Sequence, residues 1–216
     1  MIYVKAWAAP PFNERECLRY AGTSPEKISA EERALFEACR REVEGRLTYK
    51  LCWGRFPLKQ EGDTLAFGSL RTDSAALRKN LEGCREVIVF AATVGLEIDR
   101  LIRRYTTLSP AKALFFQAIG AERIESLCDA CCAAWKAEGL QLRPRFSPGY
   151  GDLPLELQRD VFRVLDCPRK IGLALNESLL MSPSKSVTAI VGIGGKAEEV
   201  TNKCSACLKT DCAYRG

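Results

Sequence analysis

The longest helical pattern in the chain does most to limit its fold. Ser109-Pro110 predicts a helix start. Proline has no backbone N–H, and the first position of a helix does not use its N–H in the helical hydrogen bonds, so proline is favoured there. Apolar residues then recur at helical spacing up to Gly139, which gives a helix of about 30 residues, or roughly 40 Å. Glu122, Glu125 and Asp129 follow a second stripe, so we expect a central helix with one polar side. The expected apolar positions are Phe115, Ala118, Ile119, Ile124, Leu127, Cys128, Cys131 and Trp135.

Shorter patterns surround this helix in an irregular order. Helices are predicted at 13–20, 29–47, 73–81, around 98–102 and at 154–165, and strands at 47–56, 64–67, 86–93 and 186–193. Ser29 with Glu32 forms a capping box, Asp73 is the expected cap of its helix, and 86–93 is the best candidate for a central strand. This order favours an α+β fold with a mostly antiparallel twisted sheet flanked by helices, including one long central helix. We expect one domain over 1–195 and a cysteine-rich tail over 196–216.

The composition excludes several classes of function. The sequence has no histidine, which argues against hydrolase triads, zinc deaminases and histidine-ligated metals. A net charge of +5 without lysine or arginine blocks does not indicate a nucleic-acid partner. No apolar run is long enough to span a membrane, and the first residues do not resemble a secretory leader. We therefore expect a cytoplasmic protein whose eleven cysteines are mostly free thiols.

The cysteines divide into two groups. Those in periodic segments are expected to pack as small hydrophobic residues. In the tail, Cys204, Cys207 and Cys212 lie close together and predict a zinc or iron–sulfur site, with Cys167 or a partner completing the ligands. A redox pair of Cys204 and Cys207, or an unligated tail, are the alternatives. The cysteines expected in the core are Cys17, Cys39, Cys52, Cys84, Cys128, Cys131 and Cys132.

Two short segments carry the chemistry of small-ligand recognition. The loop Arg145–Asp152 joins a guanidinium to two glycines, a proline and the ring of Tyr150, which suits a small anionic ligand. A structural turn with an incidental arginine is the plainer alternative. The second segment, Met181–Val187, leads into the apolar strand and is weak by itself.

Together, in this order and spacing, the two segments resemble the activation domain of cobalamin-dependent methionine synthase, in its free-standing bacterial form. The family's Arg-x-x-Pro-Gly-Tyr matches Arg145–Tyr150, and its Met-x-Pro-x-x-Ser-Val matches Met181–Val187. The resemblance implies binding of S-adenosylmethionine. It implies that Arg145 holds the carboxylate, that Glu125 pairs with the ammonium, and that Tyr150 faces the sulfonium or the adenine. The implied site also includes Pro148, Gly149 and Ser186.

The alignment on the long helix leaves Glu122 and Asp129 as alternatives to Glu125. The alternative interpretation is that Glu125 and Asp129 lie on a solvated face of the helix.

The function implied by the resemblance is support of reductive methylation, the reactivation of cobalamin. The cobalt-ligating histidine of the full-length enzyme is missing, so the cobalamin is expected on a partner methionine synthase or another corrinoid protein. An electron donor such as flavodoxin or ferredoxin is a further expected partner. Whether this component of a methyltransferase system is itself catalytic stays open. The alternatives are a metal or iron–sulfur accessory protein that uses the terminal cysteines, and a module that only binds a corrinoid protein.

Overall fold

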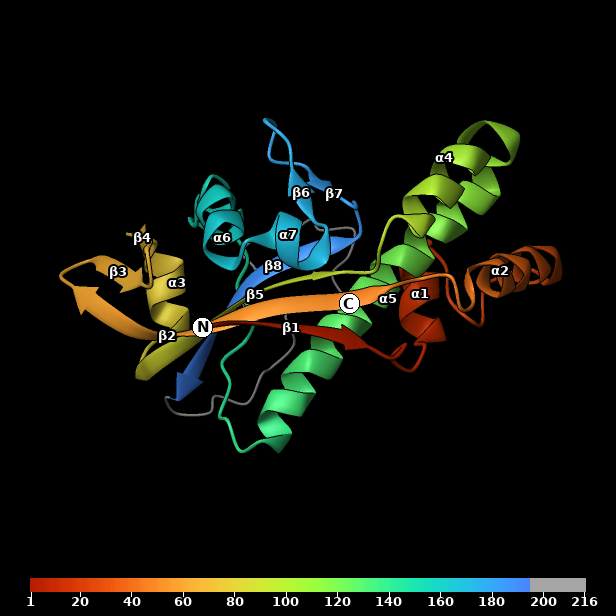
Figure 1. Cartoon of the computed structure of the whole chain (residues 1–216). Coiled ribbons are helices and arrows are strands. Elements are labelled where there is room, and N and C mark those ends of the chain that lie inside the picture. The colour runs from red at the N-terminus through yellow and green to blue at the C-terminus, as the bar shows by residue number, and fades with distance from the viewer. Residues whose placement is uncertain (195–216) are drawn as a thin grey trace.

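The computed structural model describes residues 1–194 and confirms the predicted fold, a mostly antiparallel open sheet flanked by helices (Figure 1). The strands of the main sheet run in the order β4-β3-β2-β5-β8, and β1 pairs with β2. The strands are β1 (Ile2–Trp7), β2 (Tyr49–Glu61), β3 (Thr64–Phe67), β4 (Leu70–Thr72), β5 (Cys84–Thr93), β6 (Ala174–Leu175), β7 (Met181–Ser182) and β8 (Ser186–Gly194). The helices are α1 (Glu14–Tyr20), α2 (Ala30–Val43), α3 (Ala75–Asn80), α4 (Glu97–Leu108), α5 (Pro110–Ala137), α6 (Leu157–Leu165) and α7 (Cys167–Ile171).

Strand β5 is central, as the sequence predicts, and it separates two hydrophobic clusters. It pairs antiparallel with β2 on one side and with β8 on the other. Side chains alternate between the faces of a strand. Accordingly, Ile88, Phe90 and Ala92 pack in the cluster that contains α5. Val87, Val89 and Ala91 pack with residues of α6 and α7 in the second cluster.

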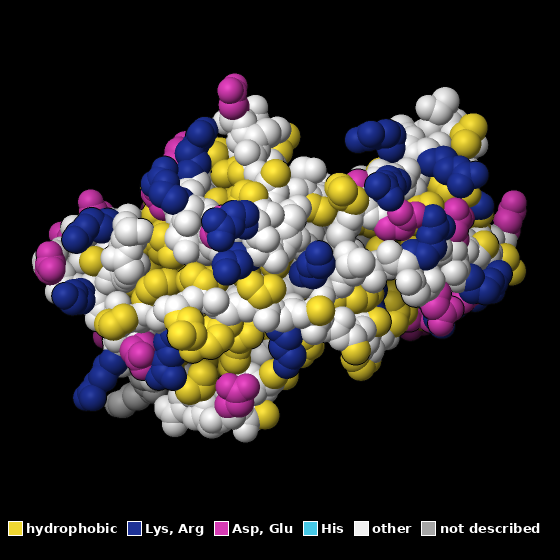
Figure 2. Space-filling model, in the orientation of Figure 1, with side chains coloured by type: hydrophobic (Ala, Val, Ile, Leu, Met, Phe, Trp, Pro, Cys, Tyr) yellow, Lys and Arg dark blue, Asp and Glu magenta, His cyan; other side chains and the backbone are white. Residues whose placement is uncertain are grey.

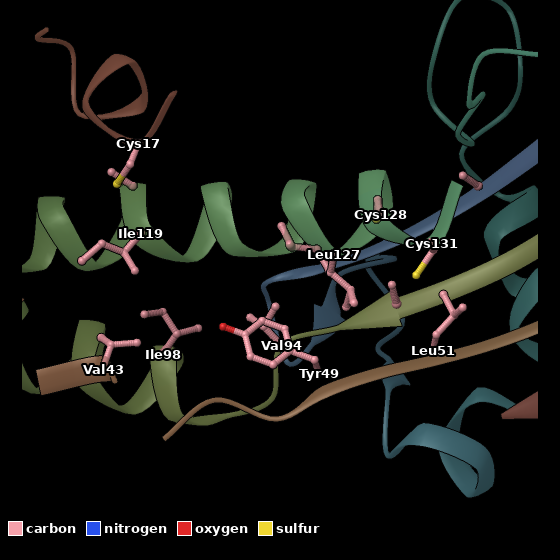
Figure 3. Packing of buried hydrophobic residues seen from close by; sticks show 14 of the residues in the cluster. Cys17, Val43, Tyr49, Leu51, Val94, Ile98, Ile119, Leu127, Cys128 and Cys131 are labelled. Atoms are coloured by element: carbon pink, nitrogen blue, oxygen red, sulfur yellow. The ribbon is translucent and has the colours of Figure 1, made fainter. Parts of the chain in front are cut away.

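The long helix α5 contains 28 residues and ends two residues before the predicted end. Figure 3 shows Cys17 of α1 on one side of α5, while Ile119 and Leu127 point toward the residues on its other side. Gly120 allows a close approach at this packing surface. A Cβ atom there would lie 2.8 Å from Lys185 Cγ and 2.9 Å from Ile98 Cγ1. The low helix propensity of glycine is thus offset by tight contact with α4 and the segment before β8.

The polar side predicted for α5 is wrong at Glu122, whose residue is only 1% exposed because α1 packs over this part of the helix. Glu122 Oε1 accepts hydrogen bonds from the Asn13 N–H at 2.9 Å and from Ser126 Oγ at 2.6 Å. Arg123 Nε donates to Glu122 Oε2 at 2.5 Å. Its other nitrogens donate to the carbonyls of Pro10 and Pro11 at 2.7 and 2.8 Å. The buried pair therefore fastens the chain before α1 to α5.

Several local predictions need correction. Ser74, not Asp73, caps α3, since its Oγ accepts from the Leu77 N–H at 3.0 Å. Asp73 accepts a hydrogen bond from Thr64 Oγ1 instead. The capping box of Ser29 and Glu32 is confirmed, but α2 ends at Val43 rather than 47. Strand β1 was not predicted, because most of its side chains are exposed on both faces and no alternation marks it. Helix α7 and strands β6 and β7 are also absent from the sequence prediction.

The eight cysteines in the described part of the chain are free thiols, and most of them are buried as predicted. Within residues 1–194, no group of three or more cysteine or acidic side chains is arranged to hold a metal. Cys204, Cys207 and Cys212, and the whole predicted tail, lie outside the described residues. None of the helices in 1–194 has both the length and the hydropathy needed to cross a bilayer. On the face shown in Figure 2, basic and acidic side chains are interspersed.

We predict that Glu122→Ala lowers the free energy of unfolding by about 3–5 kcal/mol, because it leaves the buried Arg123 guanidinium without its carboxylate. Urea denaturation measures the change. The matched control is Glu37→Ala, which removes a surface pair with Arg40 at 3.5 Å and should cost less than about 1 kcal/mol. Equal losses for the two variants would contradict a structural role for the Glu122–Arg123 pair.

Candidate functional site

The segment that carries Arg145 is held along the edge of the sheet. The Arg143 N–H donates to the Gly192 carbonyl at 2.9 Å, and the Gly194 N–H donates to the Gln141 carbonyl at 2.8 Å. Phe146 exchanges both backbone hydrogen bonds with Ile190, at 2.9 and 2.8 Å. Since β8 is a strand of the main sheet, these bonds give the residues from Gln141 to Phe146 a fixed backbone position.

A tight turn follows directly. The Tyr150 N–H donates to the Ser147 carbonyl at 3.1 Å, and Gly149 has a φ of 85°. Proline at the second position and a positive φ at the third define a type II turn, which favours glycine there. The Gly149 N–H donates to the Leu153 carbonyl at 2.9 Å. The amides of Gly149 and Tyr150 are therefore used inside the loop and do not face a ligand.

Asp152 anchors the far end of the loop to helix α3. Its carboxylate accepts from the N–H groups of Ala75 at 2.8 Å and Ala76 at 3.1 Å, and also from Ser74 Oγ. The Ser74 hydrogen bond, with these backbone donors, lowers the pKa of Asp152. Gly151 lies close to α3, because a Cβ atom there would be 3.1 Å from Ala76 Cβ. The loop is thus fixed at both ends, by β8 and by α3.

Arg145 extends from this loop to helix α5, where it meets two carboxylates one turn apart. Its Nη2 donates to Glu125 Oε2 at 2.8 Å, and its Nη1 lies 2.8 Å from Asp129 Oδ1. Nη1 is buried, and its geometry toward Asp129 does not satisfy a hydrogen bond, so it keeps donor capacity. The Arg145 side chain is 13% exposed, while those of Glu125 and Asp129 are 37% and 70% exposed. The structure therefore brings together the guanidinium and the helix-borne carboxylate expected from the sequence.

Burial and charge act in opposite directions at this guanidinium. Burial alone would lower the pKa of Arg145, but the nearby Cys128, Glu125 and Asp129 raise it overall. Arg145 consequently remains a cation. Burial raises the pKa of Cys132, and Arg145 opposes that rise. The thiols beside Arg145 are thus held in the neutral form.

The other predicted site residues lie at different depths. Pro148 is buried and Gly149 is exposed, as expected of the inner and outer corners of one turn. The ring of Tyr150 is 50% exposed and meets the ring of Phe146 edge-on, with centroids 5.2 Å apart. Ser186 is buried, and its Oγ lies 2.8 Å from both Thr93 Oγ1 and the Pro183 carbonyl. Its hydroxyl therefore ties β8 to β5 and to the preceding loop.

Two further carboxylates, those of Glu122 and Asp99, form structural hydrogen bonds and do not contact Arg145. The oxygens of Glu122 are occupied by Asn13, Ser126 and Arg123, so Glu122 does not join the group around Arg145. Asp99 of α4 accepts from the N–H of Ser184 at 2.9 Å and from its hydroxyl, which holds the segment that precedes β8. Two cavities of about 420 and 410 Å³ in the described part of the chain are lined by other residues. In the group around Arg145, the carboxylates reach solvent while the guanidinium is mostly buried.

Tyr20 is a neighbour of this group that the sequence reasoning missed. It ends helix α1 and is partly buried, and the charge of Glu125 acts on its hydroxyl. The only signal in the sequence was its place at the end of a short helix, which does not reveal that α1 packs against α5. Tyr20 thus places an aromatic hydroxyl within the electrostatic reach of Glu125.

Comparison with known proteins supports the fold. The protein-family models contain no match to this chain, and no curated protein matches its sequence. A solved structure described as the crystal structure of the MetH reactivation domain bound to AdoHcy is similar, with a TM-score of 0.70. The similarity covers 92% of this chain and 80% of that chain, at 16% sequence identity. The two proteins therefore share a fold.

We predict that Tyr20 ionises late and reports on Glu125. Burial, together with the charges of Glu125 and Glu16, raises the pKa of Tyr20 from 10.0 to about 12. The folded state therefore holds this proton more tightly than the unfolded state. The resulting stability is complete below pH 10 and is lost as the pH rises toward 12.

Burial also raises the pKa of Tyr49, so ultraviolet titration of tyrosinate should show late transitions from both residues. The Tyr20 transition should be absent from Tyr20→Phe. The same transition should move to lower pH in Glu125→Gln and stay in place in Glu44→Gln, on a different part of the surface. A late transition that keeps its pH in Glu125→Gln would show that Glu125 does not act on Tyr20, and would contradict the prediction.

Proposed function

We propose that this protein binds S-adenosylmethionine at the group formed by Arg145, Glu125, Asp129 and Tyr150, and supports reductive methylation of cobalamin held by a partner. The single observation that carries the proposal is the contact between a mostly buried guanidinium and helix-borne carboxylates. The two motifs of the resemblance and the fold shared with the MetH reactivation domain support it.

The ion pair of Arg145 and Glu125 is a suitable receptor for the amino-acid end of the ligand. That end carries a carboxylate and an ammonium on one carbon atom. When it enters, its carboxylate takes the Arg145 fork, and its ammonium takes the oxygens that Glu125 and Asp129 release. The two contacts that Arg145 makes with Glu125 and Asp129 are thereby replaced by an ion pair of Arg145 with the ligand carboxylate and by contacts of both acidic side chains with the ligand ammonium. The spare donor capacity of Arg145 Nη1 adds to this exchange.

The rest of the ligand has a place outside the ion pairs. The exposed face of Tyr150 offers a π surface to the sulfonium cation or to the adenine. Since the amides of Gly149 and Tyr150 are bonded within the loop, we assign recognition to side chains. Pro148 and Gly149 act by fixing the turn that presents Tyr150, and Ser186 acts by fixing the start of β8.

This chemistry agrees with the absence of histidine from the sequence. S-adenosylmethionine supplies an electrophilic methyl group, and its transfer to reduced cobalt removes no proton from the donor. The protein therefore needs no general base, and its task is to align the methyl group with its acceptor. A rigid loop fixed to β8 and α3 serves that task, because misplacement of a reacting group slows such reactions strongly.

The acceptor requires a partner. These 216 residues contain no histidine that could ligate cobalt in the family's manner. We therefore assign the cobalamin to a partner methionine synthase or another corrinoid methyltransferase, with an electron donor such as flavodoxin or ferredoxin supplying the reducing equivalent. The exposed carboxylate of Asp129 and the half-exposed Tyr150 are compatible with the approach of such a partner.

The affinity for S-adenosylmethionine should depend on Arg145. Calorimetry should detect binding to the wild type, and Arg145→Gln should weaken it by about 1.5–3 kcal/mol, since a charge-assisted hydrogen bond is lost. Arg145→Lys should recover only part of the affinity, because an ammonium cannot make the two-pronged contact.

The matched control is Arg143→Gln on the same segment, where Arg143 Nε donates to the Asn80 carbonyl at 2.7 Å. It should bind normally once circular dichroism shows that it is folded. A folded wild-type protein that gives no heat with S-adenosylmethionine would contradict the proposal.

A metal at the terminal cysteines stays a prediction. Elemental analysis and the visible spectrum of anaerobically purified protein test it. A zinc or iron–sulfur site predicts metal that is lost in Cys204→Ser and Cys212→Ser but is retained in Cys84→Ser, a partly buried cysteine of β5. Colourless, metal-free wild-type protein would remove the metal function while leaving the Arg145 group unaffected.

A further inference from the structure

The hairpin formed by α4 and α5 ends in a tip that has no part in the proposed function. Figure 1 shows this hairpin projecting from one end of the sheet, with the turn between the two helices at its outer end. Leu108, the last residue of α4, is 71% exposed, and Leu114 in the second turn of α5 is 51% exposed. Two bulky apolar side chains therefore face solvent at a projecting point of the described chain.

The charged residues of the hairpin near this tip are all basic. From Arg100 to Ala121 the sequence contains no acidic residue. Arg100 pairs with Glu97 at 3.4 Å, whereas the other basic side chains of this stretch form no ion pair within residues 1–194. Figure 2 shows basic side chains gathered along the hairpin. The unpaired cations are Arg103, Arg104 and Lys112.

Two of these cations meet at one aromatic ring between the helices. Arg104 Cζ lies 5.4 Å from the centroid of the Tyr105 ring, and Lys112 Nζ lies 4.8 Å from it. The carboxylate at this ring is that of Glu42 on α2, which accepts hydrogen bonds from the Tyr105 hydroxyl at 3.1 and 3.2 Å. With Glu42 counted, the tip still carries a net positive charge.

The acidic residues of α4 lie at its other end. Glu97 pairs with Arg46 and Arg100, and Asp99 accepts hydrogen bonds from Ser184. These carboxylates are bound at the base of the hairpin and are at least one helical turn from the cations near the tip. The positive charge near the leucines is therefore not neutralised from α4 itself.

The order of apolar and basic groups along the hairpin favours a lipid surface. Leu108 lies one helical turn beyond Arg104, so the apolar side chain stands outside the cations. A projecting apolar point requires a matching pocket on a protein partner. The headgroup layer of a bilayer requires none, because it is fluid and lets such side chains reach the acyl boundary, while its anionic lipids attract the cations.

We propose that the tip of the α4–α5 hairpin binds the surface of a bilayer that contains anionic lipids. Leu108 and Leu114 enter the boundary between the headgroups and the acyl chains. Arg103, Arg104 and Lys112 bind the lipid phosphates. Such contact is peripheral and needs no membrane-spanning segment. It does not depend on the proposed function, since the residues around Arg145 do not belong to the tip.

Sedimentation of the full chain with vesicles tests the proposal. The probe is a vesicle of phosphatidylglycerol and phosphatidylcholine in equal parts, and pure phosphatidylcholine is the uncharged comparison. The protein should sediment with the anionic vesicles and stay in solution with the uncharged ones. High salt should release it, because exposed charges are screened.

Two variants with matched controls locate the contact. Arg104→Gln should lower the partition coefficient about fivefold, because each basic residue near an anionic surface adds to binding. Leu108→Asn should lower it about tenfold, because an apolar side chain no longer leaves water. The controls remove the same groups elsewhere and should bind normally. They are Arg71→Gln, at an exposed position of β4, and Leu180→Asn, at a 65% exposed position between β6 and β7.

Tryptophan fluorescence checks that the tip enters the bilayer. The emission of Leu108→Trp should move to shorter wavelength when anionic vesicles are added, and that of Leu180→Trp should not. Absence of sedimentation with anionic vesicles, equal binding to pure phosphatidylcholine, or equal losses in the variants and their controls would overturn the proposal. Binding of soluble polyglutamate without binding of vesicles would assign the tip to an acidic protein and would also overturn it.

Discussion

Helix α5 is enclosed over most of its surface, and this enclosure decides the role of each charged group on it. Sheet residues pack on one side, and α1, α2 and α4 pack on others. A charge in such a place must be paired, because burying it alone costs several kcal/mol. Glu122 finds its partners in Arg123 and the chain before α1. Glu125 and Asp129, nearer to solvent, find Arg145. The pairing that anchors the N-terminal segment and the pairing that forms the candidate site are consequences of one packing arrangement.

The difference between these two pairings explains why only one of them suits a ligand. Glu122 and Arg123 are almost completely buried, and they also bind the backbone of Pro10, Pro11 and Asn13, so no incoming group can replace them. The backbone of Arg145 is held in place by the hydrogen bonds of its segment to β8, but its carboxylate partners Glu125 and Asp129 are 37% and 70% exposed. A zwitterion can therefore exchange with them at low cost. The proposed recognition of the ligand depends on a cation held in place beside anions that the ligand can displace.

The sequence predicted those parts of the fold that are encoded by local patterns. Strand β5, the capping box of α2 and the turn at Pro148 and Gly149 depend on neighbouring residues, and all three are present. Where tertiary contacts decide, the prediction was wrong or incomplete. Glu122 follows the polar stripe of α5 and yet is buried, because α1 covers it. Strand β1 has no alternating pattern, since it is held by backbone pairing with β2 rather than by a buried face.

A fold shared at 16% identity and a TM-score of 0.70 shows which requirements such a chain must meet. Core positions demand only apolar side chains of fitting volume, so their sequence can drift while the backbone persists. A ligand with fixed charges restricts the sequence more strongly, because only side chains of opposite charge at particular positions can bind it. The proposed binding of S-adenosylmethionine therefore depends on the contact between Arg145 and Glu125 and on the turn that presents Tyr150. The shared fold sets the positions of those groups, and the chemistry of the groups decides what the site can bind.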